Sequence, residues 1–172
     1  MAHPSHRSRL DRLDLKILAA LQADGRITNL KLADLVGLSA TPCLQRVRRL
    51  EAAGYIRAYG AEIDARRLFD HVVIYSQIVL TSQRATDVAR FERFLETEPR
   101  IVECVRVAGE SDYLVKSVAR DVADHQDLID LLLGDAVGAL RVTSQVATRS
   151  IKQSRVFPLE MWSAAAPTMV RQ

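Results

Sequence analysis

The chain has 172 residues, of which 48% are apolar, and a formal net charge of +3. This composition supplies enough apolar side chains for a packed core, and it excludes the disordered class, which combines low hydrophobicity with high net charge. The charge is uneven, because residues 1–60 carry 10 Lys and Arg against 5 Asp and Glu, whereas residues 61–172 carry 14 against 16. A basic first third joined to a mildly acidic remainder favours a nucleic-acid-binding module attached to a second module.

The sequence does not indicate a metal site, a disulfide framework, a membrane span or a secretory signal. Cys43 and Cys104 form no paired CxxC motif, and the four histidines lack metal-ligand spacing, so we expect no metal site, no disulfide framework and no bound cofactor. No apolar run reaches the ~18–20 residues that cross a bilayer. Residues 1–9 lack the apolar core of a secretory signal. We therefore expect a cytoplasmic, nucleoid-associated protein without a membrane partner.

The first elements are a polar arm and a helix. Residues 1–9 are polar and are expected to form a disordered arm. Residues 10–22 repeat apolar side chains at helical spacing, and Asp24-Gly25 ends that helix.

The stretch TNLKLADLVGLSATPCLQRVRRLEAAG, residues 28–54, predicts two further helices joined by a tight turn. Gly37 supplies the turn, where a backbone with positive φ costs little. Leu44, Val47 and Leu50 repeat every three residues and predict one buried stripe on the second helix of the pair. The order is that of a helix-turn-helix. Residues 55–63, which follow, predict a small hairpin or an extended linker at the place of a wing.

The second helix of this pair is cationic outside its apolar stripe. The N-terminal half of such a helix can enter the DNA major groove, which is about 12 Å wide. An ordinary helical hairpin with a solvated basic face is the alternative. The side chains expected to approach base edges or phosphates are Ser39, Thr41, Pro42, Cys43, Gln45, Arg46, Arg48 and Arg49.

Strand and helix signals alternate after residue 70. Strands are predicted at 71–80, 101–108, 113–118 and 142–151, and helices at 85–98 and 121–133. The order β-α-β-β-α-β is the split βαβ, or ferredoxin-like, arrangement. The predicted class is therefore α+β. Its parts are an N-terminal winged helix-turn-helix (10–60), a linker (61–70), a ferredoxin-like domain (71–158) and a C-terminal tail (159–172).

The first of these strands is apolar on both of its faces. Val72, Ile74, Ile78 and Leu80 share one face, and Val73, Tyr75 and Val79 share the other. A sheet with one face open to water should alternate apolar and polar residues. The second face is therefore predicted to pack on another sheet, most simply that of a second copy of the chain. Cover by the tail, through Met161 and Trp162, is the alternative.

Four segments resemble the Lrp/AsnC family, the leucine-responsive and asparagine-operon type of regulator. The segments LDRLDLKILAALQADGRIT, TPCLQRVRRLEAAGYI, GESDYLVK and IKQSR each read like its leucine-responsive branch. Lys31 departs from the acidic or amide side chain that the family often carries there. The resemblance implies a winged helix-turn-helix that binds double-stranded DNA. It also implies a ferredoxin-like domain that binds an amino acid, forms homodimers and commonly builds octamers.

The resemblance also implies an effector site. In the family a GxxDY loop and positions on the last strand contribute to a pocket near the interfaces between dimers. In this chain Gln145 replaces an aromatic residue of that strand, and Ala147 replaces a larger aliphatic one. The candidate effectors are leucine and other branched-chain amino acids, held without a covalent bond. The implied effector-binding residues are Gly109, Glu110, Ser111, Asp112, Tyr113, Ser144 and Val146.

The function that the resemblance implies is a sequence-specific transcriptional regulator of amino-acid metabolism genes, responsive to an amino-acid effector. The alternative is a nucleoid-packaging protein that wraps DNA without a ligand, and it would show weak sequence preference and no ligand response. An enzyme is not expected, because no catalytic constellation of Ser, Cys, His and Asp is visible.

Overall fold

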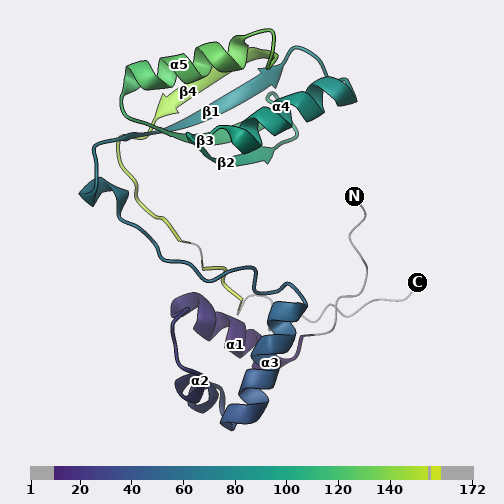
Figure 1. Ribbon diagram of the computed structural model, residues 1–172, viewed down its shortest axis with the longest axis vertical. Helices are drawn as coiled ribbons and strands as arrows, with labels where there is room; N and C mark the ends of the chain where they lie inside the picture. The colour runs from purple at the N-terminus through teal and green to yellow at the C-terminus, as the bar shows by residue number, and fades with distance from the viewer. Residues whose placement is uncertain (1–9, 155, 160–172) are drawn as a thin grey trace. The chain divides into compact units, whose positions relative to one another are not determined.

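The computed structural model describes residues 10–154 and 156–159, which form two compact units. Unit 1 contains the described residues up to Glu62 and those from Lys152 onward, and unit 2 is Ile63–Ile151. Figure 1 shows unit 1 as a group of helices and unit 2 as a sheet with helices. Residues 152–154 and 156–158, which the sequence assigned to the second domain, are grouped with the first unit by their contacts. The predicted arm and residues 160–172 of the predicted tail lie outside the described residues.

Unit 1 contains the three predicted helices, α1 (Arg12–Ala23), α2 (Asn29–Val36) and α3 (Ala40–Ala52). Helix α1 starts with a capping box, in which the Asp11 carboxylate accepts from the Asp14 N–H at 2.8 Å and Asp14 accepts from the Asp11 N–H at 3.1 Å. Helix α2 ends at Gly37, whose φ of 76° confirms the left-handed turn.

The core of unit 1 is small. Its buried members are Ile17, Ala20, Leu32, Ala33, Val36, Cys43 and Leu50. Leu30 and Leu35 of α2 are 73% and 65% exposed, because this short helix buries only the stripe formed by Leu32, Ala33 and Val36. Leu44 of the predicted stripe on α3 is 38% exposed.

The segment after α3 is extended. None of its described residues from Tyr55 to Asp64 is in a strand, so the chain adopts the linker alternative and not the hairpin. Tyr59 fastens the segment to α3 by donating to the Glu51 carboxylate at 2.9 Å. Burial, together with this bond to a carboxylate, raises the pKa of Tyr59 to about 12.

Unit 2 confirms the ferredoxin-like order. After a short 3-10 turn (Ala65–Arg67), the chain forms β1 (Val72–Leu80), α4 (Ala85–Thr97), β2 (Ile101–Arg106), β3 (Tyr113–Ala119), α5 (Val122–Leu133) and β4 (Ala139–Val146). The four strands are antiparallel in the order β2-β3-β1-β4. Helix α5 is capped at its N-terminus, because the Asp121 side chain accepts from the Asp124 N–H.

The last strand starts and ends earlier than predicted. Its ladder begins at the pair Leu80–Ala139 and reaches Ile74–Val146. The predicted residues 147–151 lie outside the strand, although the Ala147 N–H still donates to the Val73 carbonyl at 2.8 Å. Val122 is 66% exposed at the start of α5.

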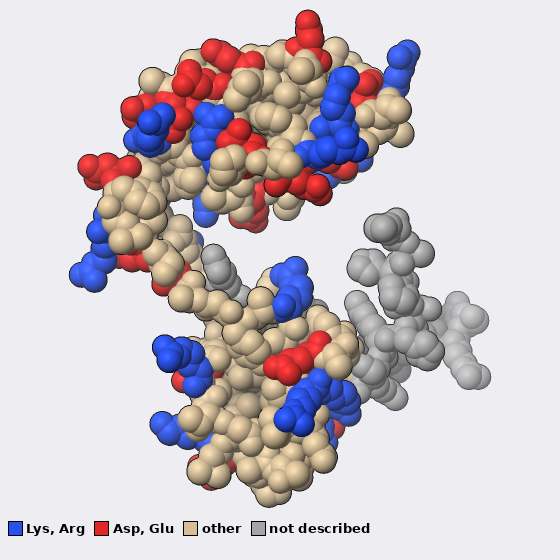
Figure 2. Space-filling view, in the orientation of Figure 1, with Lys and Arg blue, Asp and Glu red and all other residues tan. Residues whose placement is uncertain are grey.

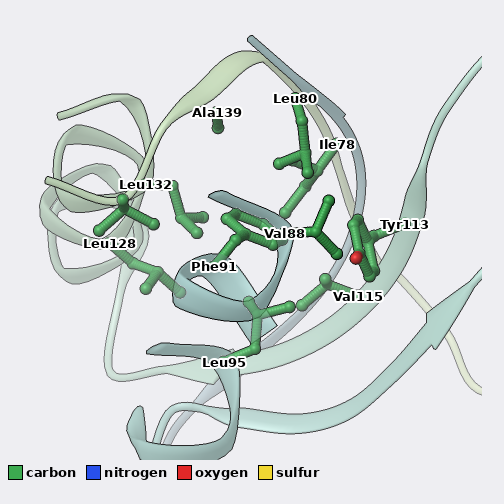
Figure 3. Close-up of a cluster of buried hydrophobic side chains, with 11 residues drawn as sticks. Ile78, Leu80, Val88, Phe91, Leu95, Tyr113, Val115, Leu128, Leu132 and Ala139 are labelled. Atoms are coloured by element: carbon green, nitrogen blue, oxygen red, sulfur yellow. The ribbon is translucent and has the colours of Figure 1, made fainter. Parts of the chain in front are cut away.

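Both helices of unit 2 cover the same face of the sheet (Figure 1). Phe91 of α4 is fully buried among side chains from β1, β3 and α5 (Figure 3), and its ring lies 5.0 Å from that of Tyr113. Among the described residues no helix covers the other face, and its side chains Tyr75, Val105 and Leu114 are 49%, 47% and 41% exposed. Met161 and Trp162, the alternative cover, lie outside the described residues.

Candidate functional site

Helix α3 presents one polar face outward. Thr41, Gln45 and Arg48 are exposed and lie three and four residues apart, so they share a face. That face is opposite Cys43 and Leu50, which are 0% and 1% exposed. Within the described residues the Arg48 side chain has no hydrogen bond or ion pair, so its guanidinium donors are available to a ligand.

The other two arginines of α3 are tied to α1. Arg46 contacts Asp14 at 2.8 Å and Asp11 at 2.6 Å, and Arg49 contacts both Asp14 oxygens at 2.6 and 2.7 Å. The Asp14 side chain is only 1% exposed. A buried carboxylate without a partner is costly, so these arginines have a structural role that the sequence analysis did not include. Hydrogen bonds from the carboxylates raise the pKa of the Arg46 guanidinium.

The position of Cys43 does not fit its predicted contact with DNA. Its side chain is fully buried in the core of unit 1, and burial raises the pKa of the thiol. It cannot approach base edges, because it lies on the same side of α3 as Leu50. Ser39 and Pro42 are exposed at the start of α3, and the Ser39 hydroxyl makes no capping bond to the helix. Figure 2 shows basic side chains, interspersed with acidic ones, on the visible face of unit 1.

The loop 109–113 is fastened to the end of β1. The Asp112 carboxylate accepts from the Leu80 N–H at 2.7 Å and from the Gln83 amide at 2.8 Å, and the Asp112 N–H donates to Ile78 at 2.8 Å. Both carboxylate oxygens are thus already used within the chain. The N–H groups of Gly109, Glu110 and Ser111 make no hydrogen bond among the described residues. They are therefore available to an anion.

The last residue of this loop faces the core. Tyr113 is 2% exposed, and its hydroxyl donates to Glu92 of α4 at 2.8 Å. Burial, with the added effect of the Glu92 carboxylate, raises the pKa of Tyr113 to about 12. The last residue of the loop is therefore anchored in the core of unit 2.

Ser144 and Val146 lie elsewhere on the sheet. Tyr113 pairs with Ile78, whereas Val146 pairs with Ile74 on the other side of β1. Four residues along a strand span roughly 13 Å. One copy of the chain therefore does not bring Val146 and the loop 109–113 into one compact pocket, and Ser144, which pairs with Ser76, lies across β1 from the strand that follows the loop.

Ser144 belongs to a buried polar cluster that sequence reasoning missed. Its hydroxyl lies 2.9 Å from the Ser76 hydroxyl and 3.0 Å from Nε2 of His125, which is 6% exposed. The signal in the sequence that could have indicated this cluster is Ser76, a polar residue in the middle of the largely apolar strand β1. Burial lowers the pKa of His125, and the nearby Arg100 adds to that effect.

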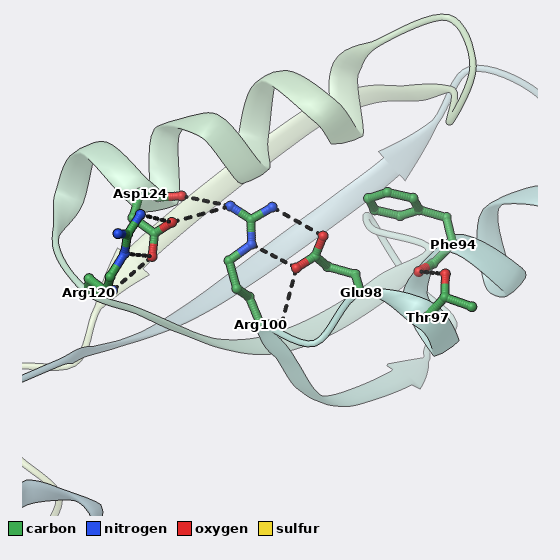
Figure 4. Close-up of polar contacts among 6 residues, drawn as sticks. All are labelled: Phe94, Thr97, Glu98, Arg100, Arg120 and Asp124. Carbon is green, nitrogen blue, oxygen red and sulfur yellow. Dashed lines mark hydrogen bonds and ion pairs between the residues drawn. The ribbon is translucent and has the colours of Figure 1, made fainter. Parts of the chain in front are cut away.

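Arg100 connects the start of β2 to the start of α5. Its guanidinium donates to Glu98 at 2.7 Å and to the backbone carbonyl of Asp124 at 3.1 Å, while the Asp124 carboxylate is also paired with Arg120 (Figure 4). Hydrogen bonds from Arg100 lower the pKa of Glu98. Hydrogen bonds from Arg120, first its N–H and then its side chain, lower the pKa of Asp124.

Neither a metal centre nor a membrane span is indicated in the part of the chain that the structure describes. No group of His, Cys, Asp and Glu side chains there could hold a metal ion. No helix there combines the length and the apolar character that crossing a bilayer requires.

Comparison with known proteins agrees with this two-unit organisation. Residues 10–57 match the winged helix-turn-helix DNA-binding family, and residues 73–157 match the Lrp/AsnC ligand binding domain. The transcriptional regulatory protein DoeX of Halomonas elongata is 44% identical over 145 residues, covering 84% of this chain and 92% of DoeX. The leucine-responsive regulatory protein of Escherichia coli is 37% identical over 145 residues, covering 84% of this chain and 88% of that protein.

Solved structures show the same fold. A Neisseria meningitidis transcriptional regulator in complex with L-Met superposes with a TM-score of 0.83 at 29% identity, covering 90% of this chain and 99% of that one. An AsnC family regulator from Agrobacterium tumefaciens gives a TM-score of 0.81 at 32% identity, covering 88% and 99% of the two chains. The chain therefore belongs to the Lrp/AsnC family of transcriptional regulators, with a helix-turn-helix unit followed by a ligand-binding unit.

Proposed function

We propose that this regulator reads operator DNA with the outward face of α3 and changes its DNA binding or assembly when an amino acid binds to unit 2. Its targets are its own promoter and genes of amino-acid metabolism, and it works in the cytoplasm on the nucleoid. The observation that best supports this proposal is the exposed face of α3 opposite its buried side, which presents Thr41, Gln45 and Arg48. Polar side chains on one face of a helix can reach base edges in the major groove.

On this face, the residues have different roles. Gln45 and Thr41 suit base edges, since an amide or a hydroxyl can accept and donate at a base pair, whereas Arg48 suits a phosphate or a guanine. Ser39 and Pro42 lie at the end of α3 that enters the groove. Arg49 keeps a guanidinium that is 58% exposed and can add a phosphate contact while it holds Asp14.

The test is selection of bound fragments from the source genome by the wild-type protein, Gln45→Ala and a control, Arg93→Ala, on the exposed surface of α4. We expect wild type and Arg93→Ala to recover the same pseudo-palindromic motif. Gln45→Ala should relax the preference at one position of each half-site, by about 1–3 kcal/mol. Recovery of all fragments alike by the wild type would instead support the ligand-independent, DNA-wrapping alternative.

For the effector, the free N–H groups at Gly109, Glu110 and Ser111 suit a carboxylate, and Asp112 holds the loop in place. Ser144 and Val146 contribute from a different copy of the chain, because one copy keeps them apart from this loop. Leucine or another branched-chain amino acid is the proposed ligand. A melting-temperature screen against the twenty amino acids tests this, since a ligand at about 100 times its Kd adds about 2.7 kcal/mol. A flat panel would contradict the amino-acid response.

We propose that the uncovered face of the sheet packs on the same face of a second copy, and that four such dimers form an octamer. The face combines half-exposed apolar side chains with a shallow cavity of about 270 Å³ beside Tyr75 and Leu114. Leu114→Glu should reduce the mass measured by light scattering to that of a monomer. Val122→Glu, on the exposed start of α5, should keep the mass of the wild-type assembly. A dimer or a larger assembly in Leu114→Glu would contradict this interface.

A further inference from the structure

A side-chain hydrogen bond joins the two helices of the helix-turn-helix at the ends where both begin. Asn29 is the first residue of α2 and Ala40 is the first residue of α3, and the Asn29 amide donates to the Ala40 carbonyl at 2.8 Å. Among the described residues, no other side-chain hydrogen bond links α2 to α3. This bond therefore restrains the first turn of α3 relative to α2.

The start of α3 has no side-chain cap of its own. The starts of α1 and α2 are capped by Asp11 and Thr28, whereas the Ser39 side chain makes no capping bond to α3. The cap at Thr28 also orders the turn of α2 to which Asn29 belongs. Asn29 thus supplies, from the neighbouring helix, the side-chain hydrogen bond that orders the start of α3.

The Asn29 side chain is costly for the fold in one respect. Its oxygen, Oδ1, is buried and has no hydrogen-bond partner among the described residues. Turning the amide over would place this oxygen against the Ala40 carbonyl, so the bond to Ala40 keeps Oδ1 unpaired. A buried polar atom without a partner destabilises a protein, and such local exceptions are expected at functional sites. This favours a role for Asn29 beyond stability.

The restrained end of α3 carries the side chains that we propose to read bases. Thr41 follows Ala40 directly, and Gln45 lies five residues after Ala40, about 7.5 Å along the helix axis. Hydrogen bonds to base edges require distances of about 2.7–3.2 Å, so a shift of about 1 Å at this end breaks them. Charge contacts with phosphates act over longer distances and carry no sequence information. Loss of the restraint should therefore reduce sequence discrimination more than DNA affinity in general.

We propose that Asn29 is a positioning residue that determines the sequence specificity of this regulator without contacting DNA. Its amide holds the start of α3 in the orientation in which Thr41 and Gln45 meet base edges. The inference rests on the proposed reading of operator DNA by α3, and it adds a specificity-determining residue on α2.

The test compares binding to two duplexes of equal length, one with the motif that wild type selects and one with that motif scrambled. Both are measured at one salt concentration, well below the melting temperatures. Asn29→Ala removes the donor together with the unpaired oxygen. It should lower the ratio of the two binding constants by about tenfold or more, the scale of a lost base contact, while keeping the melting temperature and the binding of the scrambled duplex.

Two further variants complete the comparison. Asn29→Asp keeps the shape of the side chain but lacks the amide donor, so it should also lower the ratio. Leu35→Ala, at a side chain of α2 that is 65% exposed, is the control and should keep the wild-type ratio.

A double variant distinguishes positioning from a general effect on the fold. If Asn29 acts through base contacts of α3, the loss of discrimination in Asn29→Ala/Gln45→Ala should be smaller than the product of the two single losses. A loss equal to that product would contradict the proposal, as would an equal loss on both duplexes with a lowered melting temperature. If wild type prefers the selected duplex and Asn29→Ala keeps that preference, this inference is wrong and the proposed function stands. If wild type shows no preference, both are wrong.

Discussion

The two units are stabilised in different ways. Among the described residues, unit 2 has a continuous apolar core of eleven buried residues between one sheet face and two helices, whereas unit 1 has seven buried apolar residues and a buried carboxylate that pairs with two arginines. In unit 1 the helix proposed to read DNA therefore also carries charges that hold the fold together. In unit 2 the core is separate from the loop where the ligand is proposed to bind. Substitutions should thus separate stability from function more cleanly in unit 2 than in unit 1.

The largest expected effect is at the centre of the unit 2 core. Phe91→Ala should lower the free energy of unfolding of that unit by about 3–5 kcal/mol, because it removes a fully buried ring and leaves a cavity. Scanning calorimetry should show the unit 2 transition shifting while the unit 1 transition stays. Phe69→Ala, at a ring that is 59% exposed, is the matched control. A loss below about 1 kcal/mol in Phe91→Ala would contradict this description of the core.

In unit 1 the largest effect is expected from removing the negative charge of the buried Asp14 side chain. Asp14→Asn should destabilise unit 1 by about 1.5–3 kcal/mol, since hydrogen bonds to charged groups contribute on this scale and the freed arginines can still reach water. Asp34→Asn, exposed on α2, should leave stability within about 0.5 kcal/mol. Urea denaturation measures both. If the two variants unfold alike, the clamp between α1 and α3 contributes nothing.

Substitution of Gly37 tests the backbone conformation of the turn between α2 and α3. Gly37→Ala should cost unit 1 about 1–2 kcal/mol, because φ is +76° there, although nothing lies within 4 Å of the added Cβ. Gly60→Ala also meets no atom within 4 Å, and its φ is not in the left-handed range, so its melting temperature should match that of wild type. Equal melting temperatures for the two variants would mean that the turn relaxes without cost.

The smallest expected effect is a pH dependence confined to unit 2. The pKa of His125 is lowered in the folded state, so below its unfolded pKa of about 6.5 the unfolded chain binds more protons than the folded one. Stability of unit 2 should therefore be complete above that pH and decrease as the pH falls below it. Arg100 and Asp124 are the charged groups acting on the imidazole.

Melting temperatures between pH 7.5 and 5.5 test this, a window above the range in which Glu98 and Asp124 titrate. His125→Gln should lose the decrease, and His71→Gln, at a half-exposed histidine, should keep it. An unchanged pH dependence in His125→Gln would assign the decrease to other groups.

The sequence predicted local patterns well and distant pairings poorly. Helical spacing places Thr41, Gln45 and Arg48 on one outward face, because a helix fixes that relation within a few residues. The pairing of Asp14 with Arg46 and Arg49 joins positions more than thirty residues apart, and no periodicity encodes it. Cys43 was assigned outward although it lies on the same side of α3 as Leu50.

In unit 2 the order of strands and helices along the chain could be predicted, and so could the bounds of β1 and β3 to within one residue, but the bounds of the last strand could not. The final strand stops at Val146 although its partner β1 extends to Val72, so neither the local pattern nor the length of the partner sets this end. Likewise, the contact of His125 with Ser144 depends on how α5 lies on the sheet.

On α3 we assign Arg48 to DNA binding and Arg46 to stabilising the fold. The most direct test is the salt dependence of operator binding, measured for wild type, Arg48→Ala and Arg46→Ala well below their melting temperatures. If Arg48 contacts one phosphate, Arg48→Ala should reduce the slope of log K against log salt by about 0.9 and keep the melting temperature of wild type. Arg46→Ala should lower the melting temperature and keep the slope. A reduced slope with normal stability in Arg46→Ala, together with wild-type binding by Arg48→Ala, would contradict the assignment of Arg48 to DNA and of Arg46 to the fold.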